Sequence, residues 1–429
     1  MKNIEHNNIF ELIALDTGLS EDELPTRLRS MGRRSFVEYT SKNGLSLLKN
    51  SMSFGSEVTD PAGKILINSG VPVGKYFEAL LDRYVNDDRF HTSPIRIECT
   101  SDVLNYYRSK SYERVGMILN DFVFSQDKFA SFYANIKDGK FDIKAMDVFN
   151  RAIDHMLSSP DGIMAMVKLF KNATEKRELI TDNINSAFIS LVLTPFARHN
   201  VLADDSGGFL LKIALTSIMQ NIAELMDCGY NPDCIDRSAK IAKSLINDDT
   251  VEEAIRMKTY ADGDKSVPIF FDQVNRKNFF LRLLVTVNLF VELIKINKTD
   301  PSNLEVHKSL YELAELGYAD REMVTFIGKL FLPAVKSLVL EYAYKIKNSC
   351  GADPIIWSTI GDMLPVKFLC PKAECLHTGQ HKTFIPEDVK IEADSVYQTR
   401  INAGMYHTCK LLTEKLQDYY KTVSQRAED

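Results

Sequence analysis

Apolar residues recur at intervals of three and four positions between about residue 100 and residue 345. The spacing is clearest in "VFNRAIDHML", "INSAFISLVL", "FLLKIALTSIMQNIAELM" and "FFLRLLVTVNLFVELI". An α-helix places residues at these intervals on one face, which must then be buried against other helices. Polar turns such as "ADDSGG" and "ADGDKSVP" separate the apolar segments. The pattern predicts a helical bundle over residues 100–345.

The stretch before the bundle has a different character. In "SEVTDPAGKILINSG", Asp60, Pro61 and Gly63 fit positions i, i+1 and i+3 of a type I turn between two short apolar runs. We therefore expect a small β-hairpin within an N-terminal region of residues 1–99. A helix is expected to follow the hairpin from about residue 74.

The helical spacing ends after Cys350, where prolines divide the chain into short segments. Proline has no backbone N–H and ends or kinks a helix. Residues 346–429 are therefore predicted to form an irregular C-terminal cap that closes on one last helix. The expected fold class is mainly α: a helical bundle with a small N-terminal β-hairpin region and this irregular cap.

Composition narrows the choice of partners. The 429 residues carry a formal net charge of -6, so no overall field attracts nucleic acid or an anionic membrane. No apolar run reaches the roughly 18 to 20 residues of a membrane span. The chain is expected to be cytoplasmic, without membrane contact and without nucleic acid as its main partner.

The C-terminal region contains candidate zinc ligands. Thiolates and imidazoles suit tetrahedral zinc, and the seven cysteines of the chain are too few and too uneven for a disulfide framework. The candidates are Cys370, Cys375, His377 and His381. Their spacing matches no standard zinc finger, and other residues could replace a member: His407 with Cys409 or Cys350. Reduced cysteines in an irregular cap are the alternative interpretation.

Six segments occur in an order that carries a family resemblance: "EVTDPAGKILINSG", "NSAFIS", "QNIAE", "SAKIAKSLI", "MKTYADGDKSVP" and "VTVNLFVEL". Together they resemble a bacterial HD-GYP domain, the cyclic di-GMP phosphodiesterase branch of the HD superfamily, over roughly residues 51–330. Asp262, Gly263 and Pro268 are similar to the end of the family signature "HHExxDGxGYP", with one residue of slippage. The resemblance implies an HD-type helical bundle.

The resemblance also identifies the positions where the family carries metal ligands. In this chain those positions hold Asn185, Gln220, Asn221, Ser238, Met257, Lys258 and Asn288. HD-type hydrolysis uses imidazoles and carboxylates around metal ions, which lower the pKa of a bridging water. None of the seven residues supplies either group, and Lys258 would repel a divalent cation. We therefore expect no catalytic residues and no cofactor at this site.

Gln220 and Asn221 stand side by side in an otherwise apolar helical stretch. A buried amide that lacks a partner costs roughly 1 to 3 kcal/mol, so we expect them to bond each other, Asn185 or Asn288. Two interpretations stay open: an ordinary core network, or a retained nucleotide-shaped pocket. In a pocket, the cations nearest to a phosphate would be Arg256 and Lys258, beside Asp262.

The sequence thus favours a non-catalytic signalling or scaffold protein built on a degenerate HD-GYP domain. It would act by contact with another signalling protein or with a second copy of the chain, or by sensing a cyclic dinucleotide. The alternative is a metal-dependent phosphodiesterase or phosphohydrolase with displaced ligands, or with a site in the C-terminal cap. A nucleic-acid module that uses a C-terminal zinc site is a third interpretation.

Overall fold

The structure is a computed structural model, and part of the chain can be described in it. The described residues are 2–6, 52–55, 57–59, 63–72, 74, 95–99, 101–197, 208–226, 232–258, 268–271, 277–333, 337, 340, 355–356, 368–369, 378–382 and 407–409. They fall in two compact units, one formed by residues 1–264 and 278–288 and the other by residues 265–277 and 289–429. Each unit is described by itself.

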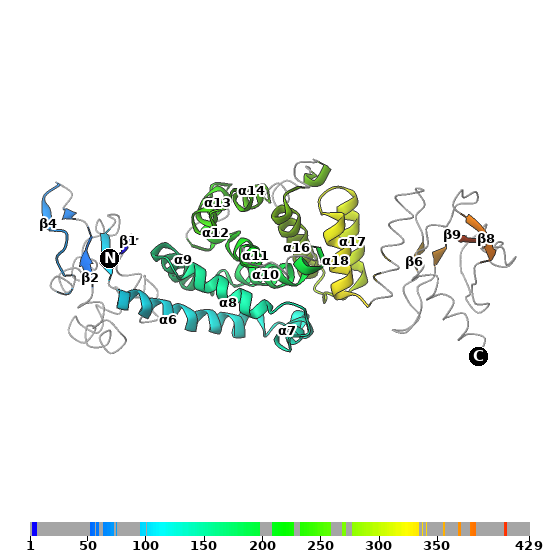
Figure 1. The fold of residues 1–429 in the computed structure, drawn as a ribbon, viewed down its shortest axis with the longest axis horizontal. Coiled ribbons are helices and arrows are strands. Elements are labelled where there is room, and N and C mark those ends of the chain that lie inside the picture. The colour runs from blue at the N-terminus through cyan, green and yellow to red at the C-terminus, as the bar shows by residue number, and fades with distance from the viewer. Residues whose placement is uncertain are drawn as a thin grey trace. The chain divides into compact units, whose positions relative to one another are not determined.

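The first unit is built mainly from helices (Figure 1). They are α6 (Ser101–Ile118), α7 (Ala130–Lys137), α8 (Ala145–Met156), α9 (Pro160–Lys171), α10 (Arg177–Ala197), α11 (Phe209–Met219), α12 (Ile222–Met226), α13 (Pro232–Ile246) and α14 (Asp249–Met257). A π-helix, η3 (Leu119–Val123), and a 3-10 helix, η4 (Asp127–Phe129), connect α6 to α7. The prediction of a mainly α helical bundle is confirmed. The domain boundaries after residues 99 and 345 stay predictions.

Short strands precede these helices. Strands β3 (Val58–Thr59) and β4 (Ile65–Ile67) pair antiparallel, as expected for a hairpin around "DPAG". Asp60 and Pro61 lie outside the described residues, whereas Gly63 has a φ of 80°, which glycine adopts without steric cost. A three-stranded antiparallel sheet, not foreseen from the sequence, has the order β1 (Lys2–His6), β5 (Ile95–Cys99), β2 (Met52–Phe54). The helix expected from about residue 74 falls almost entirely outside the described residues.

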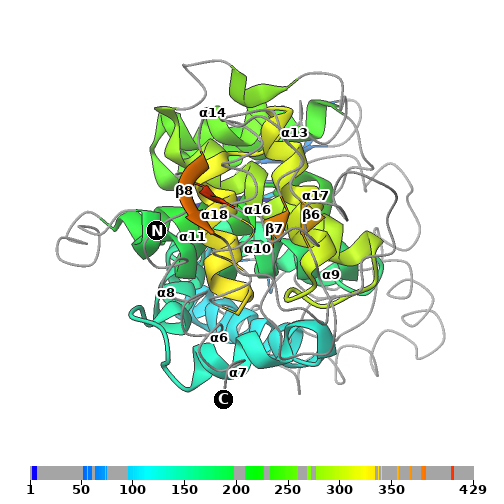
Figure 2. The same ribbon diagram turned by 90° about the vertical axis from the view of Figure 1, so that its right-hand side faces the viewer.

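Helix α10 forms the centre of the first unit. Its side chains are buried without interruption from Asn183 to Thr194, so no face of this stretch meets solvent. It packs against α8 and α11, which lie beside it in both ribbon views (Figures 1 and 2). Phe188 of α10 stacks on Phe149 of α8, with ring centroids 4.8 Å apart. Large apolar side chains and close helix packing therefore supply most of the core.

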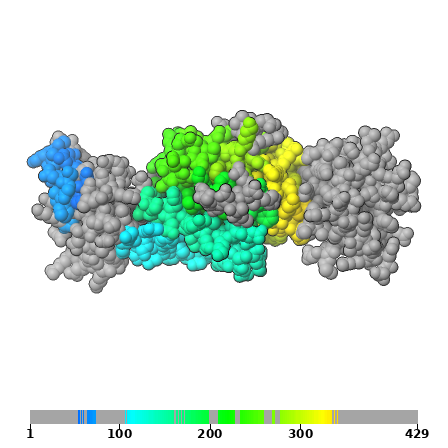
Figure 3. All heavy atoms as spheres, viewed as in Figure 1, coloured from blue at the N-terminus to red at the C-terminus, as the bar shows by residue number. Residues whose placement is uncertain are grey.

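Helix α6 lies at the edge of the same unit and keeps exposed positions along its length (Figure 3). An ion pair between Arg108 and Asp154 joins it to α8. Hydrogen bonds from Tyr112 and Arg108 lower the pKa of Asp154, and burial together with Asp154 raises the pKa of Tyr112 to about 12. Tyr112 therefore keeps its proton and donates to the carboxylate at neutral pH.

The second unit contains the 3-10 helix η6 (Ile269–Phe271), α17 (Leu304–Glu315) and α18 (Arg321–Phe331). Helix α16 (Phe279–Ile296) passes from the first unit into the second after residue 288. Two strand pairs follow: β6 (Ile355–Ile356) with β7 (Phe368–Leu369), and β8 (Thr378–Lys382) with β9 (His407–Cys409). Among the described residues, no helix is long and apolar enough to cross a membrane.

His307 is a fully buried histidine in α17. Its Nε2 lies 2.8 Å from the carbonyl oxygen of Pro301, and its ring packs on Phe290 with centroids 5.3 Å apart. A carbonyl oxygen only accepts hydrogen bonds, so Nε2 carries the hydrogen. No described group donates to the other nitrogen, Nδ1. Burial lowers the pKa of His307 to about 4, although the bond to Pro301 opposes part of this change.

We predict that His307 makes the protein less stable as the pH falls from about 6.5 to about 4. The unfolded chain binds the proton near the ordinary histidine pKa of 6.5, whereas folded His307 binds it only near 4. The unfolded state therefore holds more protons in this window, and the free energy of unfolding falls by about 3 kcal/mol across it. Urea unfolding of the wild-type protein and of His307→Leu, at several pH values, measures the effect.

The variant should be less stable at neutral pH but should lose less stability on acidification than the wild type does. Equal losses in the two proteins would show that His307 is not the group responsible.

Candidate functional site

Gln220 and Asn221 occupy a break between two helices. Helix α11 ends at Met219 and α12 begins at Ile222, so the two amides lie in the turn that joins them. The helix-like spacing of "IALTSIMQNIAELM" hides this break, because both flanking segments keep their apolar faces. Gln220 is only 2% exposed, so both ends of its side chain need partners within the protein.

Gln220 forms a reciprocal pair with Asn288 of α16. The Nδ2 of Asn288 donates to Oε1 of Gln220 over 2.6 Å, and Nε2 of Gln220 donates to Oδ1 of Asn288 over 3.2 Å. Ser186 of α10 donates from Oγ to the same Asn288 oxygen over 2.8 Å. These bonds join α10, the α11–α12 turn and α16 at one point.

Asn221 is bonded to α10 through Asn183. Its Nδ2 donates to Oδ1 of Asn183 over 3.1 Å, and Nδ2 of Asn183 donates to the carbonyl oxygen of Ile218 over 3.3 Å. Ile218 lies in the last turn of α11, where carbonyl groups have no partner within the helix. Asn183 therefore satisfies one of these carbonyls.

Lys258 completes the arrangement. It follows the last residue of α14 and is 2% exposed. Its Nζ donates to Oδ1 of Asn221 and, over 3.3 Å, to Oε1 of Gln220. The residues so connected form what we call the amide–lysine cluster: Asn183, Ser186, Gln220, Asn221, Lys258 and Asn288.

Two of the residues predicted for this site have other partners. Asn185 accepts a hydrogen bond from the Tyr133 hydroxyl and donates to Oε1 of Gln126 over 3.5 Å. Burial raises the pKa of Tyr133, so this hydroxyl remains a donor. Ser238 of α13 accepts from the backbone N–H of Ala223 over 3.0 Å and so satisfies a donor in the first turn of α12. Of the partners expected for Gln220 and Asn221, Asn288 bonds Gln220. Among the described residues, no hydrogen bond joins the two amides to each other or to Asn185.

Sequence reasoning missed Asn183 and Ser186, although a signal for both was present. They stand three residues apart and therefore share one face of α10. A polar pair at this spacing, in a helical stretch that is buried on all sides, needs polar partners from neighbouring elements. Asn221 is the partner of Asn183, and Asn288 is the partner of Ser186.

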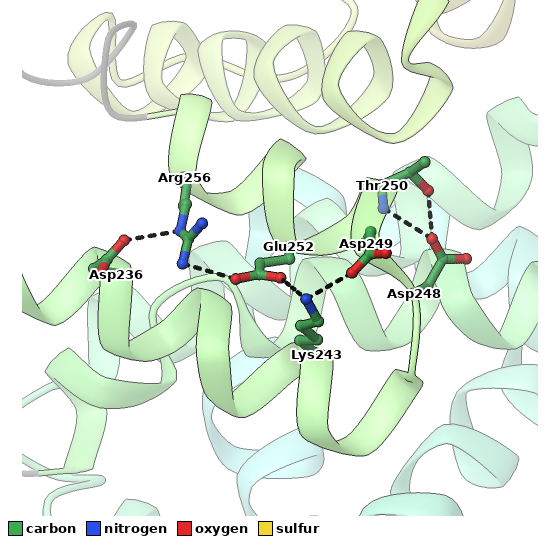
Figure 4. Close-up of polar contacts among 7 residues, drawn as sticks. All are labelled: Asp236, Lys243, Asp248, Asp249, Thr250, Glu252 and Arg256. Carbon is green, nitrogen blue, oxygen red and sulfur yellow. Dashed lines mark hydrogen bonds and ion pairs between the residues drawn. The ribbon is translucent and has the colours of Figure 1, made fainter.

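Arg256, a candidate phosphate ligand, belongs to a separate network of charges between α13 and α14 (Figure 4). Its Nε lies 2.8 Å from Asp236, and its NH2 nitrogen lies 2.7 Å from Glu252. Lys243 lies 2.6 Å from both Glu252 and Asp249, so cations and carboxylates alternate along the row. This network fixes α14 on α13, one turn before Lys258.

Met257, half-buried at the end of α14, lies next to Lys258 in the chain.

Asp262 and Gly263 lie outside the described residues, and Pro268 belongs to the second unit. The zinc candidates Cys370, Cys375 and His377 also lie outside them, whereas His381 lies on β8. Strand β8 pairs with β9, which places the backbone around His381 beside the segment of His407 and Cys409. The zinc site stays a prediction.

The chemistry of the amide–lysine cluster follows from its groups. It contains neutral amides, one hydroxyl and one lysine side chain, and it has no carboxylate or imidazole with which to hold a metal ion that activates water. Within the described part of the chain, no three or more His, Cys, Asp or Glu residues gather as a metal site would require. The cluster is suited to hold helices together and to bind a cation.

No family model, curated protein or solved structure matches the chain.

We predict that Ser238→Ala lowers the free energy of unfolding by about 1 to 2 kcal/mol, because the buried N–H of Ala223 loses its acceptor. Ser244→Ala is the matched control on the same helix, since the Ser244 hydroxyl is exposed and bonds the backbone of its own turn. Chemical denaturation of the three proteins measures the difference. An equal effect of the two substitutions would show that Ser238 does not cap α12.

Proposed function

We propose that the chain is a non-catalytic signalling or scaffold protein, built on a degenerate HD-GYP-like helical domain, that acts through contacts with other proteins. The amide–lysine cluster carries this proposal. Gln220, Asn221, Lys258 and Asn288 stand where the resemblance puts metal ligands, and hydrogen bonds join them to one another. A site of this kind can keep the helices in place without performing chemistry.

Water activation is the step that such a site lacks. A phosphodiesterase of the HD type needs metal-bound carboxylates and imidazoles to generate a nucleophile near neutral pH. Amide oxygens are neutral, and the Lys258 ammonium adds a positive charge beside Gln220 and Asn221. A divalent cation placed among these groups would be repelled by Lys258 rather than held by carboxylates.

Nucleotide sensing is less well supported than protein contact. Lys258 is buried and donates to two amide oxygens, while Arg256 is paired with Asp236 and Glu252. A phosphate group would have to displace these partners to reach either cation. Contact with another signalling protein, or with a second copy of the chain, requires no such rearrangement.

We predict that the purified protein does not hydrolyse cyclic di-GMP when manganese or iron is added. The reason is that the groups around Gln220 and Asn221 cannot activate a water molecule. The measurement is product formation under conditions in which an active HD-GYP enzyme serves as the positive control. Metal-dependent turnover that disappears in Gln220→Ala, and persists in the control Ser244→Ala, would overturn the proposal in favour of displaced ligands.

We also predict association with a protein partner, measured as sedimentation of the chain alone and with purified candidate signalling proteins. A concentration-dependent complex with a second copy, or a defined complex with one candidate, is the expected result. Calorimetric binding of cyclic di-GMP that is lost in Lys258→Met, and kept in the control Lys140→Met at an exposed site, would shift the function to ligand sensing. A strictly monomeric chain that binds no candidate would count against the scaffold proposal.

A further inference from the structure

The amide–lysine cluster surrounds a positive charge with oxygen atoms. The Nζ of Lys258 donates to Oδ1 of Asn221 and to Oε1 of Gln220, and the lysine is 2% exposed. Removing an ammonium from water is unfavourable unless oxygen acceptors replace the lost hydration. The two amides supply such acceptors from consecutive residues of one turn.

The direction of every amide in the chain of hydrogen bonds is fixed by its two ends. An ammonium can only donate and a backbone carbonyl can only accept. Lys258 donates to Asn221, Asn221 donates to Asn183, and Asn183 donates to the carbonyl of Ile218. Reversing any one amide would set two donors or two acceptors against each other, so the oxygen of Asn221 must face the ammonium.

The second acceptor is Oε1 of Gln220. Asn288 holds Gln220 through two reciprocal bonds, and Ser186 donates to the Asn288 oxygen. A hydroxyl can donate or accept, so the orientation of this pair is fixed at its other end, where Oε1 of Gln220 faces Nζ of Lys258. Other protein contacts hold both acceptors in place, and Asn221 is also oriented without the lysine, because its chain of hydrogen bonds ends at the Ile218 carbonyl.

The helix end adds an attraction of its own. Gln220 is the C-cap of α11, so the ammonium lies beside the end of a helix where the unpaired carbonyl groups carry partial negative charge. A cation at a helix C-terminus is favoured over a neutral group of the same size.

We propose that Gln220 and Asn221, at the C-terminal end of α11, form a preorganised cation site that the Lys258 ammonium occupies and that accepts a small alkylammonium ion when this side chain is truncated. This goes beyond the scaffold function and would hold whatever partner the chain binds. The ligand class follows from the geometry, since Asn183 orients Asn221 without Lys258 and Asn288 holds Gln220 in place.

The test uses the full-length chain with Lys258→Ala, which removes three methylene groups and the ammonium. The n-propylammonium ion has the same atoms, so it can restore both the packing and the charge. Lys258→Ala is expected to lower the midpoint of thermal unfolding. Saturating n-propylammonium is expected to restore about half of that loss or more, because a ligand that binds only the folded state stabilises it.

Three controls isolate the site. The wild-type protein, whose site is filled, should not gain stability from n-propylammonium. Lys240→Ala removes a lysine that is 66% exposed and pairs with Asp236, and it should show no rescue. 1-Propanol carries the same alkyl chain without the charge. Rescue by 1-propanol equal to that by n-propylammonium, or no rescue by either, would overturn the cation site.

A second measurement holds even if Lys258→Ala does not fold. In the wild-type protein labelled with nitrogen-15 lysine, one ammonium signal at neutral pH should exchange its hydrogens with water far more slowly than the others. That signal should be lost in Lys258→Arg, because arginine carries no label, and a slowly exchanging signal that remains would belong to another lysine. Exchange of all lysine ammonium groups at the rate of exposed lysines would show that no ammonium is held in the site.

Discussion

The structure of the first unit depends on a helical stretch, residues 183–194 of α10, that has no solvent-facing side. A helix buried on all sides cannot turn its polar residues toward water, so each of them must find a partner within the protein. In α10 this requirement is met for Asn183, Asn185 and Ser186, three polar residues within four positions, whereas the buried hydroxyl of Ser190 has no partner among the described residues. The neighbouring helices are arranged so that each of the three is satisfied from a different direction.

Several irregular features follow from this requirement. The interruption between α11 and α12 lets Gln220 and Asn221 reach Asn288 and Asn183, which two successive positions on a continuous helix would not do because they point about 100° apart. The interruption exposes new backbone donors at the start of α12, and Ser238 satisfies one of them. The π-helix η3 and the turn after it bring Gln126 to Asn185. Two polar residues in the core of α10, Asn183 and Asn185, thus have partners in irregular segments of the backbone.

The mainly α fold could be predicted because helical periodicity depends only on local spacing. The hairpin at residues 58–67 could be predicted because "DPAG" has its own turn preference. The contact between Gln220 and Asn288 was expected only because a family resemblance related two segments that are distant in the chain, and the two side chains are hydrogen-bonded. Asn185 was assigned to the same site, but its rotation about the α10 axis directs it to Tyr133 instead. Side-chain direction of this kind follows from packing, which the sequence pattern alone does not contain.

The complete burial of residues 183–194 in α10 also determines what can be observed about motion in the first unit. Amide hydrogens in Ile184–Thr194 are separated from water on every side, so they can exchange with deuterium only when the surrounding helices open together. Those in α6, where exposed positions recur along the helix, can exchange through local fraying. Hydrogen exchange in α10 therefore reports the stability of the whole unit, and exchange in α6 reports only the attachment of one helix to it.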